Sequence, residues 1–124
     1  MKNQSKKVFK RNEGFRLSFK EPIQTTFTIL QIEDKEVTSK EGEIRIVDIS
    51  LKGAKLTCKL SLPVPNTVIS IEYSLAKEPF FIHGELIWKK DASEGFIYGI
   101  QFLSSSYSEE TLLQTLKEYV NKNK

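Results

Sequence analysis

The chain has few of the residues that enzyme and metal sites need. Its 124 residues include one cysteine, Cys58, and one histidine, His83, which are too few for a tetrahedral zinc site or Cys-His catalysis. The carboxylate pairs Glu33-Asp34 and Glu109-Glu110 lie in an expected turn and at an expected helix start, where solvation and capping explain them. We therefore expect a binding protein, with no catalytic residues and no metal site.

Long hydrophobic runs and phosphate-binding glycine loops are also missing. No apolar stretch approaches the roughly 18 residues of a membrane helix, and the basic start of the chain has no apolar block behind it. There is no GxxxxGK sequence, and Gly95 to Gly99 lacks the strand-to-helix setting of a dinucleotide fingerprint. A single cysteine forms no internal disulfide. Together these features predict a cytoplasmic protein without membrane insertion.

Positive charge is concentrated at the N-terminus. Residues 1–20 hold seven Lys or Arg against one acid, whereas the remainder holds twelve against fifteen. A basic segment on a mildly acidic body favours a compact anionic partner over a long polyanion, so we expect no DNA or RNA partner. Single-stranded nucleic-acid binding, with Trp88 or Tyr98 as stacking surfaces, is an alternative to such a compact partner. Both rings lie on expected strands, where core packing is the usual role.

After residue 20 the hydrophobic pattern mostly has a period of two, which predicts strands. The fold class that follows is mainly β, a small six-stranded antiparallel barrel, because closure removes exposed edges. Prolines and an asparagine mark a loop at 63–66. The expected strands cover 26–32, 44–46, 54–58, 69–73, 80–88 and 96–102.

The period changes near the C-terminus, which predicts one α-helix. Ser106 or Ser108 can cap it, and the acids that follow suit the positive end of the helix dipole. Its apolar stripe packs on the barrel or, alternatively, binds a partner; the stripe contains Leu112, Leu113, Leu116, Tyr119 and Val120. We expect a flexible basic segment at 1–8, one domain at 9–120 and a polar tail at 121–124.

The segment Asp48-Ile49-Ser50-Leu51-Lys52-Gly53-Ala54 has the parts of an anion and guanine site. Asp48 can accept from the guanine N1 and N2 donors, and Ser50 can donate to a phosphate. Gly53 would allow a turn with positive φ and close approach of a ligand. The upstream arginines offer planar donor forks for phosphate or for a base edge. Taken alone, however, D-x-S-x-x-G also describes an Asx-type turn between two strands.

The chain resembles the PilZ domain family of small bacterial β-barrels over roughly residues 9–120. Its D/N-x-S-x-x-G motif corresponds to Asp48, Ser50 and Gly53. Gly84 to Trp88 resembles the family's G-x-x-x-W-like strand, and Tyr98 to Phe102 resembles its closing Y-G-I-x-F strand. The four motifs, including the upstream arginines, occur in the family's order. The resemblance implies the PilZ barrel with a C-terminal helix and binding of cyclic di-GMP.

The arginine motif departs from the family's RxxxR pattern. Four residues separate Arg11 from Arg16 instead of three, so Asn12 stands where the first arginine is expected. The resemblance implies that Arg11 and Arg16 hold guanine and phosphate, with Lys10 and Asn12 as further candidates. Because this segment precedes the expected barrel, we expect it to be flexible without ligand and ordered with it.

The resemblance leaves two functions open. The first is a receptor and adaptor that changes conformation on binding cyclic di-GMP and signals to an unidentified protein target. The alternative is a PilZ-like interaction adaptor that does not bind the nucleotide. The irregular arginine spacing favours the alternative, whereas the intact D-x-S-x-x-G motif opposes it. In both, the protein acts without cofactors.

Overall fold

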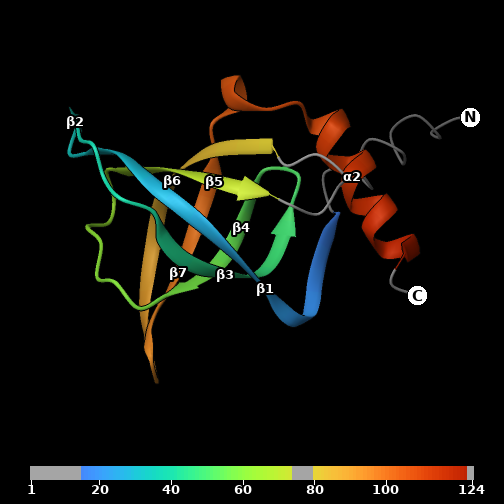
Figure 1. The fold of residues 1–124 in the computed structure, drawn as a ribbon, viewed down its shortest axis with the longest axis horizontal. Coiled ribbons are helices and arrows are strands. Elements are labelled where there is room, and N and C mark those ends of the chain that lie inside the picture. The colour runs from blue at the N-terminus through green and yellow to red at the C-terminus, as the bar shows by residue number, and fades with distance from the viewer. Residues whose placement is uncertain (1–14, 74–79, 123–124) are drawn as a thin grey trace, which may run out of the picture.

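The structure is a computed structural model that describes residues 15–73 and 80–122. Its elements follow one another along the chain as seven strands, a short 3-10 helix and an α-helix (Figure 1). They are β1 Arg16–Ile32, β2 Lys35–Glu36, β3 Gly42–Ser50, β4 Gly53–Cys58, β5 Thr67–Tyr73, β6 Phe80–Ala92, β7 Gly95–Phe102, η1 Ser104–Ser106 and α2 Glu109–Lys122.

The strands form a closed antiparallel barrel. Their order is β2-β1-β3-β4-β7-β6-β5, and β1 also pairs with β5, so six strands complete the circle. The two-residue β2 pairs only with the end of β1, through Gln31 to Glu36 and Ile32 to Lys35. The prediction of a mainly β, six-stranded antiparallel barrel with a C-terminal helix is confirmed. Closure satisfies backbone groups that an open sheet would leave at its edges.

The first strand is longer than the sequence pattern predicted. It begins at Arg16, not at Thr26, and its pairing with β3 shifts register between Ser18 and Ile23. The interval contains Pro22, which has no N–H to donate and interrupts the alternation. In Figure 1 the blue start of β1 bends away from the rest of the strand. The expectation that Arg16 precedes the barrel in a flexible segment is therefore wrong.

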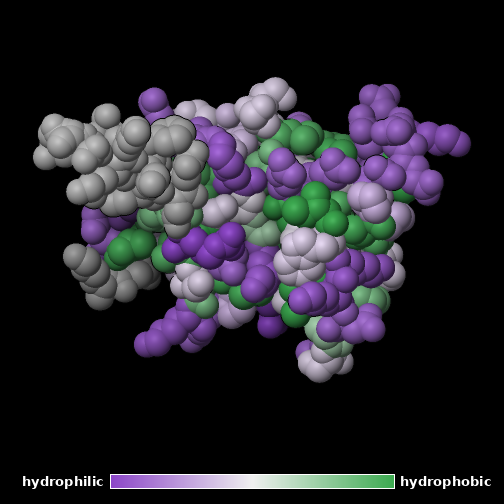
Figure 2. Space-filling model, turned by 180° about the vertical axis from the view of Figure 1, so that it is seen from behind, coloured by the Kyte–Doolittle hydropathy of each residue, from purple (hydrophilic) through white to green (hydrophobic). Residues whose placement is uncertain are grey.

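One hydrophobic core fills the barrel. On β5 the residues Ile69, Ile71 and Tyr73 are buried, as the period of two predicted. Their neighbours across the barrel interior are mostly Ile, Leu and aromatic side chains. Figure 2 shows the outside from behind, where hydrophilic side chains surround groups of hydrophobic ones. No helix in 15–73 or 80–122 has the length and apolar character to cross a membrane.

Helix α2 packs on one end of the barrel (Figure 1). Leu112 and Leu116 are fully buried, which confirms the expected core-facing stripe there, whereas Val120 is 37% exposed. Ser108 caps the helix, because its Oγ accepts from the N–H of Thr111 at 3.2 Å. The helix continues to Lys122, so it includes the first two residues that the sequence placed in a polar tail.

The bent start of β1 also contacts α2. The rings of Phe19 and Tyr119 meet edge to face with centroids 5.5 Å apart. This contact fixes the N-terminal end of β1 between the helix and β3. The strand can therefore present Arg16 at a defined place on the barrel surface.

Candidate functional site

A groove of about 490 Å³ lies on the outside of the barrel, over β3, β4, β7 and the middle of β6. Its volume falls in the range usual for small-ligand sites. It brings together four residues that the sequence predicted, namely Arg16, Asp48, Ser50 and Gly53. Its remaining lining residues are Lys52, Ala54, Lys55, Ile87, Trp88, Gly99, Ile100 and Gln101.

Two β-bulges build this outer face. In β3 the register shifts between Ile46 and Asp48, and in β6 it shifts between Leu86 and Trp88. An extra residue reverses which side of the sheet the following side chains face. Ile46 faces the barrel interior, but because of the bulge Asp48, two residues later, faces outward. The next residue, Ile49, faces the interior and is fully buried.

The strand register then places outward-facing residues of five neighbouring strands side by side, and we call these residues the outer row. Its pairs are Ser18 with Asp48, Asp48 with Lys55, Lys55 with Gly99, and Gly99 with Trp88. The neighbouring row faces inward and is apolar; it contains Leu17, Ile49, Ala54, Ile100 and Leu86. The polar site thus lies directly outside a packed layer of the core.

Asp48 is held between two cations. Nη1 of Arg16 donates to its Oδ1 at 2.5 Å, and Nζ of Lys55 lies 3.7 Å from its Oδ2. The Asp48 side chain is only 8% exposed, whereas that of Arg16 is 55% exposed. A guanidinium has five N–H donors, so Arg16 can keep this ion pair and still offer donors to a ligand. The ion pair places the Arg16 guanidinium beside the Asp48 carboxylate at the groove.

Ser50 organises the turn between β3 and β4. Its Oγ accepts from the N–H of Gly53 at 3.1 Å and from the N–H of Lys52 at 3.3 Å. The hydroxyl also donates to the carbonyl of Gly53 at 3.2 Å. The Ser50 hydroxyl makes this turn, not the Asp48 carboxylate as in the Asx-type turn that the bare D-x-S-x-x-G pattern suggested, since Asp48 pairs with Arg16 and Lys55. The hydroxyl therefore shapes the groove wall and lies at its surface.

Gly53 is required for a different reason than the sequence suggested. Positive φ values occur at Glu33, Asp34, Asn66 and Gly95 among the described residues, so the prediction of positive φ at Gly53 is wrong. Gly53 instead opens β4 opposite Gln101. A Cβ there would lie 2.3 Å from the carbonyl oxygen of Ile100, a distance that no side chain tolerates. Glycine thus allows β4 and β7 to approach closely beneath the groove.

Trp88 belongs to the groove, and the expectation that it packs in the core is wrong. Its side chain is 36% exposed, whereas Tyr98 is 1% exposed. A Cβ at Gly99 would lie 2.0 Å from the indole Nε1, so the ring rests against the backbone of β7. Core packing was expected because Trp88 ends an apolar-rich strand, but the bulge at Ile87 adds one residue before it and turns its side chain outward.

Three further polar residues of the groove were not predicted as site residues. Lys52 and Lys55 come from the β3–β4 turn and from β4, and Gln101 comes from β7 opposite Gly53. The signal for the lysines was their position within and just after the D-x-S-x-x-G motif. With Arg16 the two lysines give the groove lining three cations against the single acid Asp48, and Lys52 is also paired with Glu109 outside the lining. Such a surface suits an anionic ligand.

The turn at the groove is tied to the segment that leads into α2. The hydroxyl of Tyr107 donates to the carbonyl of Leu51 at 2.6 Å, and the N–H of Phe102 donates to the carbonyl of Lys52 at 2.8 Å. Lys52 Nζ also pairs with Glu109 at 2.8 Å. Burial and the nearby Glu109 raise the pKa of Tyr107, and the positive charge of Lys52 partly offsets this rise. These contacts connect the β3–β4 turn to the start of α2, so a structural change at the turn would alter contacts of the helix start.

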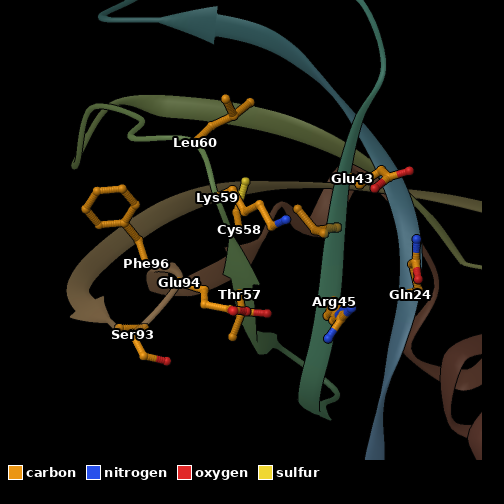
Figure 3. A pocket seen from close by; sticks show the side chains of 12 residues that line it. Gln24, Glu43, Arg45, Thr57, Cys58, Lys59, Leu60, Ser93, Glu94 and Phe96 are labelled. Atoms are coloured by element: carbon orange, nitrogen blue, oxygen red, sulfur yellow. The ribbon is translucent and has the colours of Figure 1, made fainter.

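A second cavity of about 520 Å³ opens where β3 and β4 stop pairing, next to the β6–β7 turn (Figure 3). Arg45 and Lys59 are matched there by Glu43 and Glu94, so its charges balance. Cys58 lies at its buried side, and burial raises the pKa of this thiol. None of the predicted site residues lines it. The groove, with its excess of positive charge, is the better match to the sequence prediction.

Lys10, Arg11, Asn12 and the basic segment 1–8 lie outside the described residues. Within 15–73 and 80–122, no group of three or more His, Cys, Asp or Glu side chains is arranged to hold a metal ion. The described site therefore consists of Arg16, the β3–β4 turn and the outer row of the barrel.

These observations define a class, a small closed β-barrel with a cationic groove beside its β3–β4 turn. The PilZ domain model matches residues 10–122, and the chain therefore belongs to the PilZ domain family. The PilZ domain of YcgR from Escherichia coli, solved with c-di-GMP, has a similar fold. The TM-score is 0.57 at 19% identity, covering 88% of this chain and 90% of that one. No curated protein sequence gives a significant match.

Proposed function

We propose that this chain is a cyclic di-GMP receptor and that the nucleotide binds in the groove beside the β3–β4 turn. The observation that carries the proposal is the Arg16–Asp48 ion pair, which assembles the two motif elements at the edge of a groove with excess positive charge. YcgR, whose PilZ domain shares this fold, was solved with the same nucleotide.

Each residue of the groove has a role that its chemistry supports. Arg16 and Lys55 would face phosphate oxygens, since both are cationic and partly exposed. Asp48 would accept from the N1 and N2 donors of guanine, which adenine does not present in the same way. Ser50 would shape the β3–β4 turn, and Gly53 would allow β4 and β7 to approach each other closely beneath the ligand. Arg11 would add a second guanidinium, with Lys10 and Asn12 nearby in the sequence.

The receptor would act as a cytoplasmic, non-enzymatic adaptor. Binding would neutralise the cations of the groove and order the basic segment around Arg11 over the barrel, which creates a new surface for a protein target. The contacts of Leu51 with Tyr107 and of Lys52 with Glu109 give the start of α2 a part in that surface. An adaptor that never binds nucleotide remains the competing function, because the arginine spacing is irregular.

Isothermal titration calorimetry separates the two functions. Wild-type protein is titrated with cyclic di-GMP, and cyclic di-AMP and GTP serve as controls. The receptor proposal expects micromolar or tighter, guanine-selective binding that Asp48→Ala abolishes while the circular dichroism spectrum stays that of the barrel. Absence of heat at high cyclic di-GMP concentration would favour the nucleotide-independent adaptor, whereas equal binding by wild type and Asp48→Ala would mean that the nucleotide binds outside this groove.

A further inference from the structure

We infer that the second cavity is a docking site for a protein partner, which adds an extended peptide segment to the open edge of β3. The inference rests on the proposed adaptor function and deepens it by naming where and how a target binds. The cavity is separate from the groove, because the two share no lining residue. It opens between β3 and the chain that follows β4 (Figure 3).

The first part of β3 has a strand on one side only. Gly42, Glu43 and Ile44 each pair with β1, but the pairing of β3 with β4 ends at Arg45 opposite Thr57. Both Glu43 and Ile44 line the cavity. An unpaired strand edge presents backbone N–H and C=O groups that another extended chain can bind. This stretch of β3 therefore offers a place for one added strand.

The chain after β4 is held away from this edge. Nζ of Lys89 donates to Oγ of Ser61 at 2.7 Å and to the carbonyl of Leu62 at 3.2 Å. The hydroxyl of Tyr98 donates to the carbonyl of Leu60 at 2.7 Å. Lys89 belongs to β6 and Tyr98 to β7, which lie on the far side of β4 from β3. Contacts of the fold thus keep the cavity open beside β3.

The charged lining suits a peptide better than an ion. The β3 side carries Glu43 and Arg45, and the other side carries Lys59 and Glu94, so each side has one acid and one cation (Figure 3). Within 15–73 and 80–122, none of these four side chains makes an ion pair or a hydrogen bond. Balanced charges favour neither sign of ligand, whereas peptide amides supply donors for the carboxylates and acceptors for the cations.

Apolar side chains add a second kind of contact. Leu60 is 52% exposed at the cavity, and Phe96 lines it as well. The buried Ile44 and Cys58 form its inner side. Successive side chains of an extended peptide face opposite sides, so one can cover apolar surface while its neighbours face the charged groups. We therefore expect a partner segment of about three residues, the length of the open edge, with an apolar residue between uncharged polar ones.

The test begins with random heptapeptides displayed on phage and selected on the full chain. An enriched peptide is synthesised with blocked termini and titrated into nitrogen-15-labelled protein. The backbone amides of Glu43, Ile44 and Lys59 should shift, whereas those of Ser50 and Gly53 in the groove should not. N-methylation along the peptide should weaken binding at every second position, because successive N–H groups of a strand point to opposite sides.

Two variants test the location of the contact. Leu60→Asp places a charge at an exposed position of the cavity and should weaken peptide binding at least about fivefold, the equivalent of losing part of one leucine contact. Val37→Asp, at a position that is 36% exposed and outside the cavity, is the matched control and should bind like wild type. Thermal unfolding confirms that both variants are folded.

The inference is overturned if no peptide is enriched, if the shifts lie outside the cavity, or if Leu60→Asp binds like wild type. N-methylation effects without a period of two would also overturn it. So would self-association of the chain that Leu60→Asp removes, because the occupant would then be a second copy.

Calorimetry with cyclic di-GMP decides the proposed receptor function separately. Nucleotide binding without peptide binding leaves the receptor function in place and refutes the docking site. Peptide binding at the cavity without nucleotide binding refutes the receptor function and supports the docking site of a nucleotide-independent adaptor.

Discussion

Nη1 of Arg16 lies 2.5 Å from Oδ1 of Asp48, although 32 positions separate the two residues in the sequence. The antiparallel pairing of β1 with β3 produces this contact, because Ser18 lies opposite Asp48 and Arg16 lies opposite Ser50. The guanidinium is more than half exposed, whereas the carboxylate is almost covered. The arginine side of the site is thus partly formed without ligand.

The donor geometry of Arg16 should matter for binding more than its charge alone. Arg16→Ala should weaken cyclic di-GMP binding at least about 10- to 100-fold, the equivalent of one charged hydrogen-bonded contact of ~1.5–3 kcal/mol. Arg16→Lys keeps the charge without the planar fork and should bind with intermediate affinity. Calorimetry measures both. Arg45→Ala, an exposed arginine of β3 outside the groove, is the matched control; equal losses in Arg45→Ala and Arg16→Ala would contradict a specific role.

Two buried tyrosine hydroxyls should differ in their effect on stability. The hydroxyl of Tyr98 accepts from the N–H of Leu62 at 2.8 Å and donates to the carbonyl of Leu60 at 2.7 Å. Tyr98→Phe leaves both backbone groups without this partner and should lower the free energy of unfolding by about 1–3 kcal/mol. The hydroxyl of Tyr73 has no hydrogen-bond partner in 15–73 or 80–122, so Tyr73→Phe should be neutral or stabilising. Urea unfolding of both variants checks the difference, and an equal cost would refute it.

Two glycine substitutions should also differ. At Gly53 an added Cβ meets the backbone oxygen of Ile100 at 2.3 Å, and strand pairing prevents an easy shift. Gly53→Ala should therefore lower the free energy of unfolding by about 1–3 kcal/mol, as overpacking typically does. At Gly99 the three atoms nearest to the Cβ all belong to the indole of Trp88, an exposed side chain that can move aside. Chemical denaturation should show the smaller loss for Gly99→Ala; the reverse order would contradict this geometry.

Stability should fall in alkaline solution. Burial raises the pKa of the Cys58 thiol and of the Tyr73, Tyr98 and Tyr107 hydroxyls. In the unfolded chain these groups lose protons near their ordinary values of about 8.5 for cysteine and 10 for tyrosine, whereas the folded protein retains them. Their contribution to stability is thus present below pH ~8.5 and decreases as pH rises above it.

The urea midpoint at pH 7.5 and at pH 10.5 tests this dependence. It should be lower at pH 10.5, and the decrease should be smaller in Tyr73→Phe, which removes one of the groups. An equal or higher midpoint at pH 10.5 would mean that these hydroxyls and the thiol do not control alkaline stability.

The regular strands could be predicted because burial follows a simple alternation. Ile69, Ile71 and Tyr73 repeat at every second position, and all three are buried as expected. The motif residues Asp48, Ser50 and Gly53 could likewise be placed at one turn. These features depend on local chemistry, which the sequence carries directly.

The bulges and the true start of β1 could not be predicted in the same way. The inserted residue at Ile87 is apolar like its neighbours, so the sequence alone does not show that Trp88 changes face. Pro22 interrupts the pattern of β1, although the strand resumes its pairing with β3 on the other side of it. Both features depend on which strand lies alongside, and that is a property of the whole fold.

The most direct test of the central claim is a nitrogen-15 NMR titration of the full chain with cyclic di-GMP. The account predicts that the backbone amides of Ser50, Gly53 and Gly99 and the indole N–H of Trp88 shift with occupancy. The backbone amide resonances of residues in the second cavity, such as Glu43 and Glu94, should not shift. Shifts confined to that cavity, or no shifts at saturating nucleotide, would contradict the assignment of the groove as the cyclic di-GMP site.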